Sequence, residues 1–92
     1  MSTQMAYRTV PAYAPESDTL VMRWVFQRGR HVVTCEIDEC EDGAGYEVSV
    51  VPHWDVASAI VEPADTTVAA LRRHAEIASE LREAGWAVAR RS

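Results

Sequence analysis

The fold is decided by residues 19–38, TLVMRWVFQRGRHVVTCEID, which predict two strands around a short turn. Along residues 19–27, large apolar side chains occupy every second position. A period of two predicts a strand that is buried on one face. The inward set is Leu20, Met22, Trp24 and Phe26, and the outward set is Val21, Arg23, Val25 and Gln27.

The return strand follows directly. Residues 28–30, Arg-Gly-Arg, have the length of a hairpin connection. Residues 31–38 then alternate again, which predicts a second strand with Val33, Cys35 and Ile37 facing inward. An acidic loop with two glycines spans residues 39–45, and glycine supplies the left-handed backbone that a tight reversal needs.

A third strand is predicted at residues 46–51, and Pro52 ends its pairing or places it at an edge. Its inward side chains are Tyr46, Val48 and Val50. Residues 57–62 predict a short fourth strand from a weaker signal, because alanine and serine are poor strand formers.

The helix is the clearest element, and it is predicted over residues 66–84. Asp65 or Thr66 can cap its N-terminus by accepting hydrogen bonds from free backbone N–H groups. Gly85 stands where a left-handed residue ends a helix, and Trp86 follows it. This pair predicts a Schellman ending, with the indole packed on Leu81 and on the inner face of the first strand near Trp24.

These elements predict a single α+β domain. It is a three- or four-stranded antiparallel β-meander with one C-terminal helix packed on one face. We expect a disordered N-terminal tail at residues 1–18, which hold two prolines and no apolar period, and a ββββα domain at residues 19–88. Residues 89–92 are expected to be a frayed C-terminus.

One helix covers only one face of a sheet, so the sequence predicts apolar side chains on the other face that the helix does not bury. The helix's apolar arc of roughly 180° is also wider than the ~100° stripe that one sheet requires. So small a domain gains little stability from its own core, which favours a second chain, most simply a copy of the same one. The predicted interaction surface comprises Val21, Val25, Val32 and Val51 on the sheet and His74 and Ile77 on the helix.

Two alternatives belong to these surfaces. Tyr7, Val10 and Tyr13 of the tail could fold back over the free face of the sheet. A histidine in the position of His74 is typical of a hydrogen-bonded residue in a core or an interface.

Acidic side chains gather around the second connection. The chain has 14 acids and nine bases for a net charge of −5, which argues against a general binder of nucleic-acid backbones. The simplest interpretation is solubility, with complementary patches that pair between chains. An alternative is a phage-type inhibitor or decoy of nucleic-acid-handling machinery. The acidic patch consists of Glu36, Asp38, Glu39, Glu41, Asp42 and Glu47.

Metal sites are not supported by the spacing of the candidate ligands. The run from Asp38 to Gly43 imitates the start of a calcium loop, but Cys40 takes its third position and Ser49 its twelfth. Cys35 and Cys40 have four residues between them and no paired second half, which is not a zinc pattern. We therefore expect no metal and no cofactor.

Catalysis is not supported either. A set of Cys35 or Cys40 with His53 and Asp55 could act as a nucleophile, a base and an orienting acid, but nothing in the spacing demands it. The expectation is that the protein is not an enzyme. No run of 18 apolar residues is present to span a membrane, and the two cysteines suggest a reduced cytoplasm.

Residues 70–86, ALRRHAEIASELREAGW, follow a short meander and end in Gly-Trp. Over roughly residues 19–86 the chain resembles small proteobacterial proteins in which a similar strand pattern and a helix ending in Gly-Trp recur. The resemblance implies the same fold and carries no activity.

The function expected from the sequence is a small, non-catalytic protein-interaction module that forms a homodimer or binds another protein. The acidic decoy is one alternative, and a weak binder of a small ligand or metal is another.

Overall fold

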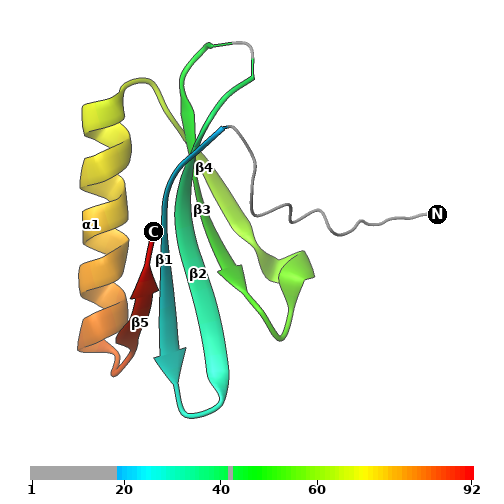
Figure 1. Cartoon of the computed structure of the whole chain (residues 1–92), viewed down its shortest axis with the longest axis vertical. Coiled ribbons are helices and arrows are strands. Elements are labelled where there is room, and N and C mark those ends of the chain that lie inside the picture. Colours follow the sequence, from blue (N-terminus) through cyan, green and yellow to red (C-terminus); the bar gives the residue numbers. More distant parts are fainter. Residues whose placement is uncertain (1–18, 42) are drawn as a thin grey trace, which may run out of the picture.

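The computed structural model describes residues 19–41 and 43–92, and it shows one antiparallel sheet with a long helix on one face (Figure 1). The α+β class and the helix after the meander are confirmed. The predicted tail at residues 1–18 lies outside the described residues. In chain order the elements are β1 (Leu20–Arg28), β2 (His31–Glu39), β3 (Tyr46–Pro52), the 3-10 turn η1 (Val56–Ser58), β4 (Ile60–Ala64), α1 (Thr67–Glu83) and β5 (Ala87–Arg91).

The sheet has five strands in the order β4-β3-β2-β1-β5, and this corrects the predicted three or four. The chain leaves the helix, returns to the first strand and pairs antiparallel with it, so that Phe26 lies opposite Val88 and Trp24 opposite Arg91. The expectation of a frayed end at residues 89–92 is therefore wrong. Strand β5 is formed by this pairing, and its short sequence carries no alternation that could predict it.

The register divides the side chains between the two faces of the sheet. Trp24, Cys35 and Val50 lie in one row across β1, β2 and β3, on the face that the helix covers. A bulge between Leu20 and Met22 changes this phase at the start of β1. Leu20 pairs with Asp38 and so leaves the inward set to which its alternation assigned it.

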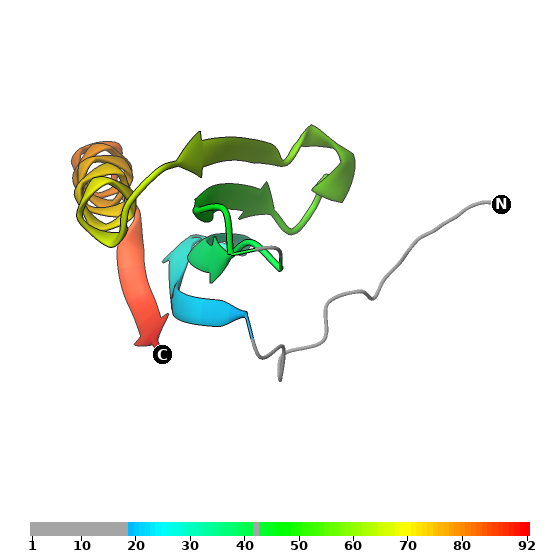
Figure 2. The ribbon, with the colours of Figure 1, turned by 90° about the horizontal axis from the view of Figure 1, so that it is seen from above.

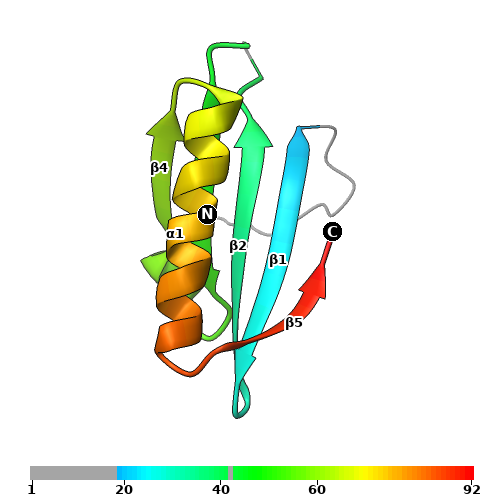
Figure 3. The same cartoon turned by 90° about the vertical axis from the view of Figure 1, so that its left-hand side faces the viewer.

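The helix lies over the half of the sheet that contains β2, β3 and β4 (Figure 3). Seen from above, β5 turns toward the helix side of the sheet (Figure 2). Helix α1 contacts β5 as well as these three strands. Part of the wide apolar arc of the helix is used inside one chain, with Ala70, His74, Ile77 and Ala78 buried. Val68 and Leu71 of the same helix remain exposed.

Both ends of the helix have the expected caps. Thr66 is the N-cap, and its Oγ1 accepts a hydrogen bond from the N–H of Ala69 at 3.1 Å. Gly85 has a φ of 96°, the left-handed region that glycine tolerates. The N–H of Trp86 donates to the carbonyl of Leu81 at 2.9 Å and that of Gly85 to Arg82 at 3.0 Å, which is the Schellman pattern.

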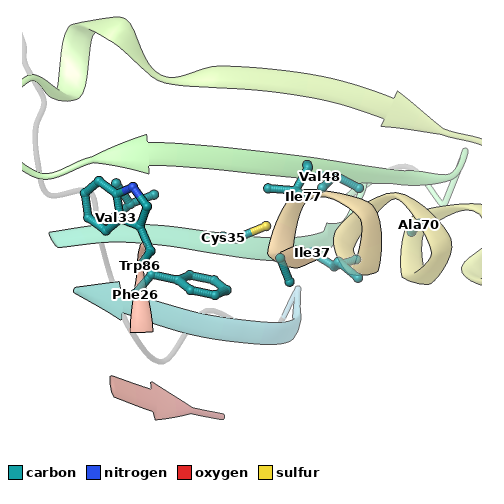
Figure 4. Packing of buried hydrophobic residues seen from close by; sticks show 9 residues of the cluster. Phe26, Val33, Cys35, Ile37, Val48, Ala70, Ile77 and Trp86 are labelled. Carbon is teal, nitrogen blue, oxygen red and sulfur yellow. The ribbon is translucent and has the colours of Figure 1, made fainter. Parts of the chain in front are cut away.

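The core lies between the helix and the covered face, and Trp86 closes it at the C-terminal end of the helix. Figure 4 shows its ring beside Phe26 and Val33. The predicted contact with the first strand is thus made by Phe26, and Trp24 lies elsewhere, against His74 and Arg91. The buried cluster is Phe26, Val33, Cys35, Ile37, Val48, Ala70, Ile77, Ala78 and Trp86.

Candidate protein-binding surface

The two helix residues of the predicted surface belong to the core. His74 and Ile77 are only 3% and 6% exposed. The Nε2 of His74 lies 3.2 Å from the carbonyl oxygen of Cys35, and its ring meets Trp24 edge-on at 5.2 Å. Burial lowers the pKa of His74, which keeps the ring neutral. The prediction that His74 and Ile77 belong to an interaction surface is therefore wrong, because both residues are buried inside the chain.

Val25, Val32 and Val51 of the predicted valines do lie on the face opposite the helix, but they are not fully exposed. Val21 lies in the bulge at the start of β1. Val25 and Val51 flank Thr34 in one row across β1, β2 and β3. Both valines are half-buried, as is Val32, and Thr34 between them is fully buried. His53 follows β3 and places its Nε2 2.5 Å from the Oγ1 of Thr34. Of the four predicted valines, only Val21 is an exposed large apolar residue.

The acidic patch carries less charge than its composition indicates. Glu36 forms an ion pair with Arg23, whose Nε lies 3.0 Å from Oε1. The pKa of Asp38 is raised to about 7 by burial and by its hydrogen bond with Glu36. Glu39, Glu41 and Glu47 are exposed. Asp42 lies outside the described residues.

A run of exposed apolar side chains lies between β3 and the middle of β4, and we call it the 54–61 ridge. It consists of Trp54, Val56, Ile60 and Val61, which are 56%, 64%, 56% and 55% exposed. Other exposed large apolar residues in the described part of the chain are Val21, Val68 and Leu71. The four side chains of the ridge are close together in the chain, with Ile60 and Val61 on opposite faces of β4, and exposed apolar area of this kind favours a binding surface. Residues 57–62 lack the alternation that would predict which side chains are exposed, so the ridge was not predicted. The adjacent apolar pair Ile60-Val61, followed by Glu62 and Pro63, is the signal of an edge strand that is apolar on both faces.

Trp54 is held in place by its neighbours. Its ring stacks on that of Trp86 with 6.1 Å between centroids and 10° between planes. His31 meets Trp54 edge-on at 4.8 Å. On Trp86, the Cζ of Arg28 lies 4.7 Å from the ring centroid, while its Nη1 donates to the carbonyl of Ala84 at 2.8 Å. An exposed but fixed indole loses little side-chain freedom on binding, which favours a role in recognition.

A shallow groove of about 240 Å³ runs between α1 and β4. One side of its rim is fixed by Arg73, whose Nε lies 2.8 Å from Glu62 and whose Nη1 lies 3.2 Å from Glu76. The groove joins the ridge at Ile60. Its apolar lining is Val50, Ile60, Ile77 and Leu81, and its charged lining is Glu62, Arg73 and Glu80.

The structure does not bring the catalytic candidates together. Cys35 points to the helix side, and burial raises the pKa of its thiol to about 12, so that it stays protonated. His53 forms a hydrogen bond with Thr34. Thr34 directly precedes Cys35 in β2, so its side chain points to the opposite face of the sheet. Asp55 accepts a hydrogen bond from Ser58. Within residues 19–41 and 43–92, no group of three or more His, Cys, Asp or Glu side chains is arranged to hold a metal.

In the same part of the chain, no helix has the length and apolar character to cross a membrane. Comparisons with protein-family models, with curated proteins and with solved structures found no match.

Proposed function

We propose that this chain is a small protein-binding domain without catalytic activity and that it acts as a homodimer. The observation that carries the proposal is the 54–61 ridge, where four apolar side chains are each more than half exposed. A small domain that leaves so much apolar area in water gains stability when a second chain covers it.

The absence of catalysis is supported by the state of the reactive groups. The thiol of Cys35 is buried and protonated, and the ring of His74 is buried and hydrogen-bonded to a backbone carbonyl. Neither group reaches the ridge or the groove as a nucleophile or base. The acidic decoy has weaker support, because Arg23 and the raised pKa of Asp38 remove charge from the patch that would imitate a nucleic acid.

Sedimentation equilibrium over roughly 1–100 µM tests the proposal, because a homodimer gains mass with concentration. We expect the weight-average mass to rise from near the 10.2 kDa of one chain to about twice that value. Val56→Ser, which removes an exposed side chain of the ridge, is expected to weaken the association and to leave the far-ultraviolet spectrum unchanged. A constant mass of one chain across the whole range would refute the homodimer.

A further inference from the structure

Strand β4 is the edge of the sheet best suited to accept another strand. No other described strand pairs with its outer side, and an edge strand presents backbone N–H and C=O groups that can bind a further chain. Ile60 lies on the helix side, in register with Val50, and Val61 lies on the opposite side, in register with Ser49. Both are more than half exposed, so a strand added beside β4 would gain apolar contacts on both faces.

The opposite edge is protected. Strand β5 ends in Arg90 and Arg91, both exposed, and charged side chains on an edge strand disfavour pairing between copies of one chain. Strand β4 has Pro63, which removes one N–H donor and limits pairing to the part of the strand around Val61. The two edges therefore differ, and β4 is the one where two chains can meet.

The helix beside β4 carries a charge pattern that fits a second copy in one orientation. Arg73 and Glu80 are seven residues apart (80 − 73 = 7), two turns on one flank of α1, and both line the groove next to β4. A two-fold axis perpendicular to α1 would run the two helices antiparallel, so that the Arg73 of each copy faces the partner's Glu80. Two parallel helices would instead place the two arginines together, which costs free energy.

We propose that a second copy of this chain pairs antiparallel with β4 about a two-fold axis near Val61, joining the two five-stranded sheets into one. This pairing brings the Ile60 side chains of the two copies close to the axis. Each of them then covers the open end of a groove between α1 and β4. The inference rests on the proposed homodimer and names its surface.

Disulfide trapping tests the position of the axis. In a Cys40→Ser background, Val61→Cys places one thiol on each chain beside the axis. Opposite residues of antiparallel strands have Cα atoms about 4.5–5.5 Å apart, within the range of a disulfide. We expect rapid oxidation to a covalent dimer on a non-reducing gel. The matched control is Val25→Cys on the same face of the sheet, three strands away in β1, which is expected to stay monomeric on the gel.

The outcomes separate the two proposals. A dimer in sedimentation that traps through Val25→Cys, or through neither position, overturns the β4 axis and leaves the homodimer standing. A chain that sediments as a monomer and traps through neither position overturns both.

Charge reversal tests the orientation. Glu80→Arg turns two attractive pairs across the axis into two repulsive ones, and we expect the dissociation constant to rise about tenfold. Glu41→Arg, an equal change of charge in the exposed loop between β2 and β3, is expected to have no effect on it. Equal dissociation constants for the two variants would overturn the antiparallel arrangement.

Discussion

At the scale of single residues, Trp54 and Trp86 share one stack but differ in burial. Trp86 is 8% exposed and closes the core, whereas Trp54 is the outer ring of the pair. We expect Trp86→Ala to lower the free energy of unfolding by ~3–5 kcal/mol, the usual loss for a buried large aromatic side chain. Trp54→Ala, the matched control, is expected to lose about 1 kcal/mol. Urea titrations at one protein concentration measure both, and equal losses would contradict the assignment of Trp86 to the core.

Asp38 predicts a pH dependence of stability with an unusual sign. Its pKa in the folded chain is raised from 3.8 to about 7 by burial and by Glu36, so the folded state binds a proton that the unfolded state has lost. The free energy of unfolding therefore falls progressively as the pH rises from about 4 to 7 and Asp38 loses its proton. Arg23 on β1 lowers this pKa, and Glu47 on β3 is its register partner on the other side.

Asp38→Asn cannot ionise, so the variant should escape this cost. We expect it to be more stable than the wild type by roughly 1 kcal/mol at about pH 8, after allowance for solvent screening, and to lose that advantage near pH 4. His74 acts in the opposite direction, because its lowered pKa removes stability as the pH falls below its ordinary value of 6.5. His74 is present in both proteins, so its contribution cancels when the free energies of unfolding of the variant and the wild type are subtracted at each pH. Parallel stability profiles of the variant and the wild type over this pH range would refute the raised pKa of Asp38.

At the scale of elements, the sequence predicted those whose side chains repeat with a clear period. The alternation of residues 19–27 and the caps around residues 66–86 are local signals, and the structure has a strand and a helix there. The bulge beside Leu20 and the strand at residues 87–91 depend on pairing between distant segments, which no local pattern encodes. The exposure of Ile60 and Val61 has the same origin, because it follows from the position of β4 at an edge.

Strand β5 contacts β1 through a side chain as well as through backbone hydrogen bonds. The Cζ of Arg91 lies 4.4 Å from the ring centroid of Trp24, a cation–π contact that covers the indole. We expect Arg91→Ala to lower the free energy of unfolding by about 0.5–1 kcal/mol, while Arg90→Ala, one residue away, changes it less. Thermal melts of the two variants provide the comparison. An unchanged stability of Arg91→Ala would show that the contact with Trp24 contributes nothing.

At the scale of the whole molecule, the wide apolar arc of the helix was the weakest guide to a partner. An arc wider than the ~100° stripe that one sheet needs predicts a second chain over the helix flank with His74 and Ile77. The real sheet has a fifth strand that turns toward the helix, and both residues are buried within one chain. The candidate surface is therefore the 54–61 ridge and not the helix flank and the outer valines. The exposure of the ridge depends on tertiary position rather than on periodicity.

The pairing of the first and last strands also governs the order of folding events. Arg28 and His31 meet across three residues, whereas Trp24 and Arg91 meet across 67 (91 − 24 = 67). Closing the longer loop carries the larger entropic cost, so we expect the hairpins to form first and β5 to dock late. Until it docks, β1 is itself an edge strand, and the ring of Trp24 lacks the cover of Arg91. A refolding chain thus passes through a stage in which a second bare edge competes for other chains, and the yield of native protein falls when refolding is attempted at high concentration.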